Sequence, residues 1–352
     1  MDAEPGARTP DSLLRVESQA IWLALVCGGV GALAGLVLTS VNGYVRLSGA
    51  DSFGLAAAAL ATVVAALVSA VGYWRSRNRP GQEWRLTLGR WTTFVTLLSV
   101  VLVHSALAFL GTYALYVVLS LAFIGLNVSG LFAAVMMGAT LGLVAFLVFP
   151  SVAQVTTQRL STLLMSYVVV GCLTAAVTTS DPLWWRVHFS QLGTFGDISS
   201  WMFNATLVAA GLLVTTFAVY LAHDIRELVA AGKLANASAP QWAARLFVIL
   251  GVMLAGVGLV PVDVSFLVHT ICASGMAVVF LILLIGGRSR LAGMESGYFV
   301  AAWAILAGIA VSIALFLARV FSVTAFEIIV FVLIFGWIAV FIRFLGLAAR
   351  ND

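Results

Sequence analysis

Two ionisable residues lie close together in an otherwise apolar stretch of this sequence. The segment VPVDVSFLVHTICAS, residues 260–274, carries Asp263 and His269, and the runs on either side, 246–259 and 275–285, contain no charged residue. An ionisable side chain at membrane depth is costly, so it normally pairs with another group, binds a ligand or relays a proton. We therefore treat His269 as a candidate catalytic base or ligand, and Asp263 as the candidate group that orients it or a cation.

Helical geometry argues against direct contact between Asp263 and His269. Six residues along a helix put two side chains about 120° apart in azimuth and about 9 Å apart in height. We expect Asp263 in the turn or at the cap of the helix, and His269 more than a turn deeper. Ser265 and Cys272 share a helical face with His269 if the helix includes them. Asp263 and His269 are then expected to meet only through a water, an ion or a substrate.

A second set of polar residues lies in the segment DPLWWRVHFSQLGTFGDISS, residues 181–200. Its two glycines predict a folded loop rather than a helix, and its tryptophans suit the headgroup region of a membrane. Ser190 in this loop is a candidate catalytic nucleophile, which a neighbouring base would activate. The candidate substrate-binding residues of the loop and of the helices near it are Asp181, His188, Asp197, Asn204, Arg319 and Glu327.

Composition is typical of a polytopic α-helical membrane protein. Hydrophobic residues make up 62% of the 352 residues and charged residues only 9%, whereas a soluble domain has about 25% charged residues. The apolar runs are continuous, as membrane-spanning helices require, whereas strands of a membrane barrel alternate apolar and polar residues. The net charge of +4 comes from basic residues in short loops, so we expect no nucleic-acid partner.

We expect an all-α bundle of about ten membrane spans. They are residues 20–41, 54–74, 91–122, 129–149, 163–180, 200–222, 243–261, 265–286, 297–318 and 323–347. Loop 75–90 is basic, and loop 223–245 is mixed in charge but contains Arg226, Lys233 and Arg245. Basic loops stay in the cytoplasm, so both loops are expected there. An even number of spans then separates them, which assigns two helices to the uncharged region 91–149, with a turn at 125–130. Both termini are expected in the cytoplasm, and the candidate residues of the C-terminal half are expected toward the outer side.

Three parts are expected along the chain. Residues 1–19 are polar, mixed in charge and unlike a cleavable signal peptide, so they are predicted to form a cytoplasmic tail. Residues 20–155 are predicted to form an N-terminal four-helix transmembrane region, and residues 156–352 a C-terminal six-helix transmembrane domain.

Two pairs of glycines in the first region are spaced for close helix packing. Gly31 and Gly35 are separated by three residues, and so are Gly138 and Gly142. Small residues at this spacing let two helix backbones approach each other. We therefore predict that each pair marks a packing face.

Several candidates also have a purely structural interpretation. Asp263 can cap the helix that follows it, and Arg319 and Glu327 can form an ion pair that holds two helices together. His104, in the third span, can bond to a neighbouring carbonyl. No metal site is predicted, because no HExxH motif occurs and few ligands are available. Cofactors are left unassigned.

Two segments of the C-terminal half resemble a known family. SQLGTFGDISSWMFNATLVAAGLL, residues 190–213, and VPVDVSFLVHTICA, residues 260–273, are similar to a bacterial, actinobacterial-type membrane family, domain of unknown function 998. The residues that carry the resemblance are Ser190, Leu192, Gly193, Asn204, Pro261 and His269. The resemblance covers residues about 160–347 and does not extend to residues 1–155.

The resemblance implies a bacterial membrane domain without an agreed activity. The family has been compared with membrane proteins that remodel lipid anchors and, more distantly, with seven-span metal-dependent lipid amidases. This chain lacks the paired HxxxH motif of those amidases on its last span, which argues against a zinc hydrolase.

From these observations we expect a protein of the bacterial inner membrane that recognises or processes a lipid-like or cell-envelope amphiphile at the outer leaflet. Membrane lipid is its expected partner, and whether it is an enzyme is left open. One alternative is a transporter of a small or amphiphilic substrate. The other is a non-catalytic structural or assembly subunit, which would bind other membrane-protein subunits.

Overall fold

The computed structural model describes residues 10–194 and 196–350. Within these ranges the chain is almost entirely helical, and ten helices are long and apolar enough to cross a membrane. The predicted all-α bundle of ten spans is confirmed, and the chain is a multi-pass membrane protein. It divides into two compact units, residues 1–155 and 156–352. The cytoplasmic location of both termini stays a prediction.

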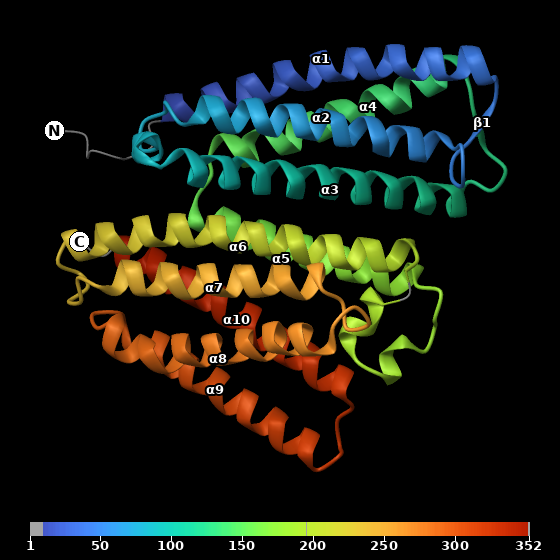
Figure 1. Ribbon diagram of the computed structural model, residues 1–352. Coiled ribbons are helices and arrows are strands. Elements are labelled where there is room, and N and C mark those ends of the chain that lie inside the picture. The colour runs from blue at the N-terminus through green and yellow to red at the C-terminus, as the bar shows by residue number, and fades with distance from the viewer. Residues whose placement is uncertain (1–9, 195, 351–352) are drawn as a thin grey trace. The chain divides into compact units, whose positions relative to one another are not determined.

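The first unit contains four long helices (Figure 1). They are α1 Pro10–Asn42, α2 Phe53–Ser76, α3 Arg90–Ala122 and α4 Gly130–Ala153. The short strands β1 Val45–Arg46 and β2 Asn127–Val128 pair antiparallel and join two connections, and the 3-10 helix η1 Glu83–Thr87 lies in a third. Residues 1–9 of the predicted tail lie outside the described residues, whereas residues 10–19 already belong to α1.

The uncharged region of the first unit holds two helices, as predicted. The helix α3 continues through Gly111 for 33 residues, and the connection to α4 lies at residues 123–129. Residues 90–122 therefore form one unbroken helix.

The two glycine pairs of the first unit both lie at the contact between α1 and α4, which confirms both predicted faces. A Cβ atom on Gly35 of α1 would lie 2.4 Å from the carbonyl oxygen of Ala133 in α4, and one on Gly31 would lie 2.7 Å from another α4 carbonyl oxygen. In the reverse direction, Cβ atoms on Gly138 and Gly142 would lie 2.9 and 3.0 Å from carbonyl oxygens of α1. The contact between α1 and α4 thus depends on the absence of side chains.

His104 in α3 bonds to a neighbouring carbonyl oxygen, which confirms the structural interpretation of this residue. Its Nδ1 lies 2.8 Å from the carbonyl oxygen of Val100, and its Nε2 lies 2.9 Å from the hydroxyl of Ser151. Since a carbonyl oxygen only accepts, Nδ1 carries the proton and Nε2 accepts from Ser151. Both ring nitrogens are therefore used within the first unit.

The second unit contains six long helices and two short ones. The long helices are α5 Thr157–Thr178, α6 Ile198–Ala230, α7 Ala239–Leu259, α8 Phe266–Arg290, α9 Ser296–Leu317 and α10 Val323–Arg350. The 3-10 helices η2 Trp184–Arg186 and η3 Phe189–Gly193 lie between α5 and α6. The helix α6 is central to this unit, because it packs against α5, α7 and α10. In its most apolar stretch of 18 residues, 72% of the residues are buried.

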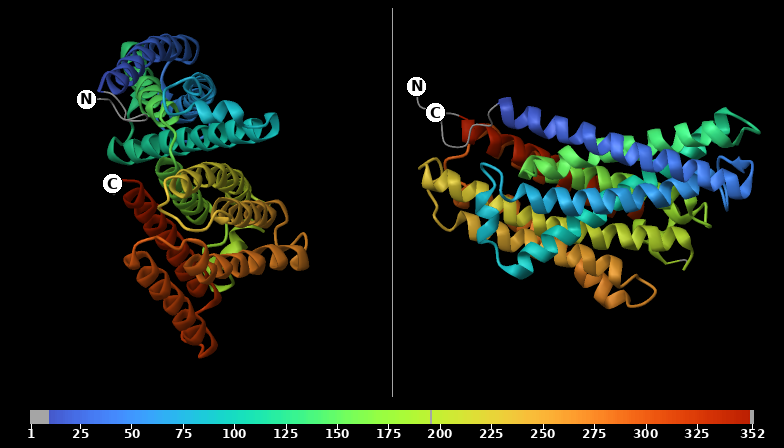
Figure 2. Two further views of the ribbon diagram at one scale, coloured as in Figure 1. Left: turned by 90° about the vertical axis from the view of Figure 1, so that its left-hand side faces the viewer. Right: turned by 90° about the horizontal axis from the view of Figure 1, so that it is seen from above.

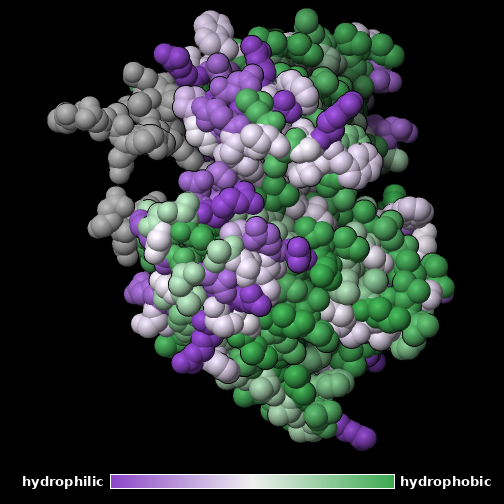
Figure 3. All heavy atoms as spheres, turned by 60° about the vertical axis from the view of Figure 1, so that its left-hand side comes forward, coloured by the Kyte–Doolittle hydropathy of each residue, from purple (hydrophilic) through white to green (hydrophobic). Residues whose placement is uncertain are grey.

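Aromatic rings form the core of this unit. Trp337 of α10 is 1% exposed, and its ring packs against Phe247 of α7, Phe280 of α8 and Phe341 of its own helix. Within each unit the long helices run side by side (Figure 2). Hydrophobic residues cover the helix flanks, and hydrophilic residues gather over the helix ends that face the viewer (Figure 3).

Candidate functional site

Three connections lie at the same end of the second unit. They are residues 179–197 between α5 and α6, 260–265 between α7 and α8, and 318–322 between α9 and α10 (Figure 1). We call this end the loop end. The predicted catalytic and substrate-binding residues all lie in these connections or in the first two turns of the helices that follow them.

The connection 179–197 is a folded loop, as predicted, and Phe189 anchors it. The ring of Phe189 packs against Trp184 of the same loop, Phe203 of α6 and Phe331 of α10, with centroid distances of 6.0, 5.5 and 5.8 Å. Edge and tilted ring contacts of this kind stabilise a packed cluster. The loop is therefore held to two helices of the bundle.

Glu327 holds the same loop through its backbone. Its Oε2 accepts a hydrogen bond of 2.6 Å from the N–H of Phe189. Arg319 is exposed at the end of α9 with a positive φ of 59°. Both residues belong to the described part of the chain, and no ion pair joins Arg319 to Glu327 there. The predicted interhelical ion pair is therefore wrong, and the carboxylate supports the loop instead.

Asp197 joins the end of α5 to the start of α6. It is the N-cap of α6 and accepts from the backbone N–H of Ser200 at 2.9 Å. It also accepts from the hydroxyls of Ser180, Ser199 and Ser200 at 2.7, 2.7 and 2.8 Å. Burial alone would raise the pKa of this carboxyl, but the bonds from Ser199, Ser200 and Ser180 outweigh it and hold the pKa well below its ordinary value.

Two further candidates also bond to backbone. The amide of Asn204 donates to the carbonyl oxygen of Gly193 at 2.9 Å, and a Cβ on Gly193 would lie 2.5 Å from the Asn204 Oδ1. A glycine is therefore required where this loop meets α6. The Oδ1 of Asp181 accepts from the N–H of Leu183 at 2.8 Å, which closes a turn. Contact of either side chain with a ligand stays a prediction.

His269 has one ring nitrogen in use and one available. The residue is 6% exposed, and its Nδ1 lies 3.0 Å from the carbonyl oxygen of Val260, the residue before Pro261. Because that oxygen only accepts, Nδ1 carries the proton and Nε2 has a lone pair. No residue in the described ranges bonds to Nε2. His269 can therefore act as an acceptor, a base or, once protonated, a cationic donor.

Asp263 is exposed in the turn, as one of the two sequence interpretations predicted, but it does not cap α8. The N-cap is Ser265, whose hydroxyl accepts from the N–H of Val268 at 3.4 Å. Ser265 therefore lies outside the helix and does not form a helical pair with His269. No hydrogen bond or ion pair joins Asp263 to His269, both of which lie in the described part of the chain.

Ser190 and His188 form the closest pair of potential nucleophile and base. The Oγ of Ser190 lies 3.2 Å from the Nδ1 of His188, and both side chains are partly buried. Burial, followed by the positive charge of His269, lowers the pKa of His188. The loop and the start of α8 lie at the same end of the unit, where the charge of His269 reaches His188.

The charged side chains at the loop end that are not bonded within the protein are mainly positive. Three of its four acids, Asp181, Asp197 and Glu327, accept hydrogen bonds that hold backbone in place. The fourth, Asp263, is exposed to solvent. The exposed side chains of Arg186 and Arg319 and the two histidines remain as donors or cations. Such a set suits an anionic or strongly accepting group.

The described residues do not supply a cluster of metal ligands at this end. No group of three or more His, Cys, Asp or Glu side chains that could hold a metal ion occurs in residues 10–194 and 196–350. A catalytic zinc normally takes three protein ligands. The side chains at this end can contribute hydrogen bonding, proton transfer and, at Ser190, nucleophilic attack.

Sequence reasoning missed one polar contact at the opposite end of the unit. The hydroxyl of Thr157, at the start of α5, donates to the Oδ2 of Asp224 in α6 at 2.5 Å. The two residues are 67 positions apart, so no local sequence pattern marks this contact.

Comparisons with known proteins identify a family but no characterised relative. The family model described as "Protein of unknown function (DUF998)" matches residues 163–343, just over half of the chain. No curated protein matches, and no solved structure matches. The matched segment contains the whole loop end, together with the two histidines and Ser190.

Proposed function

This chain belongs to the DUF998 family of proteins of unknown function, and we propose that its second unit binds the anionic headgroup of a lipid-like amphiphile at the outer leaflet of the bacterial inner membrane. The observation that carries the proposal is the available Nε2 of His269, which lies at the same end of the unit as the His188–Ser190 pair. The site lies where three membrane helices begin, so an amphiphile can keep its acyl chains in the bilayer while its headgroup reaches the loop.

The use of the neighbouring acids supports an anionic ligand. The carboxylates of Asp197 and Glu327 are occupied by donors from the protein, so they add little repulsion. Protonated imidazoles and the Ser190 hydroxyl donate to phosphate or carboxylate oxygens, and such charge-assisted bonds are stronger than neutral ones. A headgroup that binds in this way raises the pKa of His188, so its affinity rises as the pH falls.

A second candidate function is acyl or phosphoryl transfer, which the 3.2 Å contact between Ser190 and His188 favours. Ser190 Oγ would attack an ester of the bound amphiphile while His188 Nδ1 accepts the hydroxyl proton, which then passes to the leaving group. Headgroup recognition remains the first choice because no carboxylate among the described residues orients His188.

The binding test exploits two different replacements of one histidine. The amide nitrogen of asparagine occupies roughly the position of Nδ1, so His269→Asn keeps the bond to Val260 and removes Nε2. In His269→Gln the amide instead lies near Nε2 and the bond to Val260 is lost. Native mass spectrometry of the full-length protein in detergent, titrated with lysophosphatidylglycerol and lysophosphatidylcholine, measures the headgroup preference.

We expect wild-type protein to prefer the anionic lipid and His269→Asn to lose about tenfold or more of that affinity, as for a hydrogen bond to a charged group. His223→Gln removes a histidine from the opposite end of α6 and is the matched control. If His269→Asn and His223→Gln bind both lipids as wild type does, the binding proposal fails. Release of a lipid fragment that stops in Ser190→Ala would instead establish the transfer reaction.

The siting is tested separately by labelling. In a variant without the native cysteines, Val187→Cys and Ala237→Cys place exposed thiols at opposite ends of the second unit. A membrane-impermeant maleimide added to intact cells is expected to label residue 187 and not residue 237. The reverse pattern would place the loop end in the cytoplasm and contradict the outer-leaflet assignment, whatever the lipid measurements show.

A further inference from the structure

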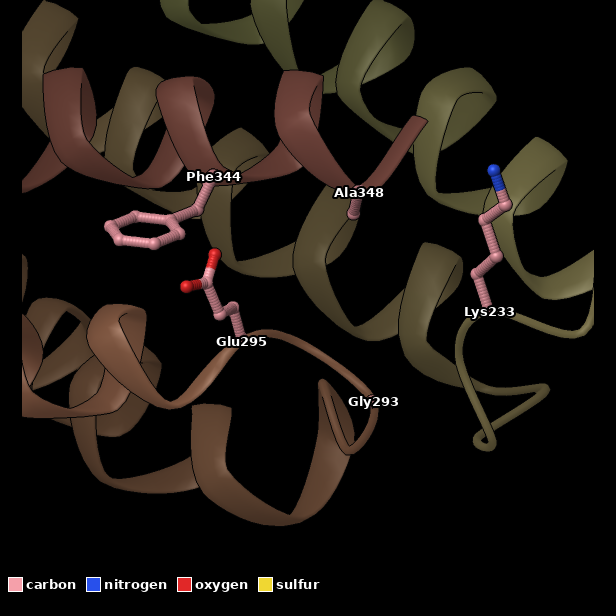
Figure 4. A pocket seen from close by; sticks show the side chains of 5 residues that line it. All are labelled: Lys233, Gly293, Glu295, Phe344 and Ala348. Carbon is pink, nitrogen blue, oxygen red and sulfur yellow. The ribbon is translucent and has the colours of Figure 1, made fainter. Parts of the chain in front are cut away.

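The second unit has a cavity at the end opposite the loop end. It has a volume of about 370 Å³ and lies between the α6–α7 connection, the α8–α9 connection and the last turns of α10. Its lining residues are Lys233, Gly293, Glu295, Phe344 and Ala348 (Figure 4). Cavities of this size hold small molecules or the headgroup of a lipid.

Glu295 presents a carboxylate to this cavity. It occupies the N-cap position of α9 but makes no side-chain capping bond. No other described residue bonds to its carboxylate, which points toward the ring of Phe344 (Figure 4). The helix dipole favours an acid at this position whichever way its side chain points. The direction of the side chain, toward a ring rather than toward the helix N–H groups, is what argues for a ligand.

Phe344 is held in place beside that carboxylate. A Cβ on Gly297, in the first turn of α9, would lie 3.0 Å from the Cζ of Phe344, so the ring rests directly on the α9 backbone. Its other neighbour is Tyr298, 1% exposed, at a ring-centroid distance of 6.3 Å. The ring is therefore fixed by the helix that also carries Glu295.

We propose that Glu295 and Phe344 bind an organic ammonium group, of the kind carried by the ethanolamine headgroup of an aminophospholipid or by a free amine. A carboxylate supplies the counter-charge and an aromatic ring the cation–π contact, which together select an ammonium over a neutral group. Across the cavity, the Nζ of Lys233 donates to the carbonyl oxygen of Ala349 at 3.3 Å. Lys233 lines the same cavity, and its positive charge suits a phosphate attached to that ammonium. This site is separate from the loop end and does not depend on the function proposed there.

The test uses the full-length protein in detergent with three probes: ethanolamine, phosphoethanolamine and phosphatidylethanolamine. Calorimetric titration measures the soluble probes, and native mass spectrometry measures lipid retention against phosphatidylglycerol. We expect Glu295→Gln to weaken binding tenfold or more, and Phe344→Leu to weaken it about two- to thirtyfold. Glu83→Gln, which changes another exposed glutamate, is the matched control and should bind as wild type.

The outcomes are distinguishable. Binding of the soluble amines as well as the lipid indicates a free-amine site, whereas binding of the lipid alone indicates a headgroup site, and either result supports the ammonium assignment if it depends on Glu295. Binding of none of the three probes, or binding that survives Glu295→Gln in a protein whose thermal unfolding is unchanged, overturns it.

Discussion

The carboxylate of Glu327 in α10 accepts a hydrogen bond of 2.6 Å from the backbone N–H of Phe189, a residue 138 positions earlier in the chain. The ring of Phe189 packs between α6 and α10 at the same place. The loop that carries His188 and Ser190 is thus positioned by the last helix of the bundle. A substitution in α10 should therefore change the position of His188 and Ser190 through the loop, without direct contact with either side chain.

Replacing Glu327 should loosen this loop. In Glu327→Leu the N–H of Phe189 loses its partner in a partly buried place, which costs about 1–3 kcal/mol. We expect a lower unfolding temperature and faster hydrogen exchange at residues 187–191. Glu327→Gln retains an acceptor oxygen and should have a smaller effect. Asp263→Ala, at an exposed residue of the same end, should change neither measurement, and equal exchange in Glu327→Leu and Asp263→Ala would contradict the assigned role.

Replacing His269 should change the titration of His188. Burial and the charge of His269 lower the pKa of His188, so His269→Asn should raise it toward the ordinary value of about 6.5. The chain has only four histidines, so NMR titration of histidine-labelled protein can follow each one. His223→Gln is the control, and an unchanged His188 titration in His269→Asn would show that the two rings do not face one site.

The same shift makes stability depend on pH in a defined direction. Because the pKa of His188 is lower in the folded than in the unfolded chain, the unfolded chain takes up its proton first as the pH falls. Stability should therefore be full above about pH 6.5 and decrease as the pH falls through the folded pKa. The decrease should be smaller in His269→Asn when unfolding is measured from pH 8 to pH 5.

Asp197 should contribute stability at neutral pH that disappears in acid. Asp197→Ala removes the cap of α6 and the bonds to Ser180 and Ser199, and loss of a cap alone costs about 0.5–2 kcal/mol. Since its folded pKa lies below the ordinary value, this contribution is present above about pH 4 and is lost as the pH falls through the folded pKa. Wild type and Asp197→Ala should thus differ at pH 7 and converge in strong acid. A difference independent of pH would mean that the carboxylate charge is not involved.

The contact between α1 and α4 should tolerate alanine at one glycine and not at another. In Gly35→Ala the new Cβ meets the carbonyl oxygen of Ala133, so overpacking should cost about 1–3 kcal/mol. Gly29→Ala makes the same change on the same helix where nothing lies within 4 Å, and it should be neutral or slightly stabilising. Thermal unfolding of the two variants compares them directly. Equal stability would show that α1 does not pack as described.

The sequence by itself determined the class of the protein and the number of its helices. Ten apolar runs are long enough to cross a bilayer, where their backbone N–H and C=O groups find hydrogen-bond partners by forming helices. The glycine spacing also predicted the faces that meet where α1 packs against α4. These properties depend on residues close together in the chain, so local pattern was enough. The same reasoning failed for the cap of α8, because the turn after Pro261 delays the start of the helix until Ser265 has become the N-cap.

Only the tertiary structure decided which polar residues belong together. Asn204 and Gly193, two of the residues that carry the family resemblance, bond to each other, and His269 bonds to the carbonyl oxygen of Val260. Asp197 and Glu327 bond to residues of the loop, and their contact with a substrate stays a prediction. The hydrogen bonds of Asn204 and Glu327 join residues that are 11 and 138 positions apart in the chain. The packing of the helices decides which of these side chains meet, and local residue spacing does not encode it. That packing also leaves the Nε2 of His269 available at the end of the unit that carries Ser190 and His188.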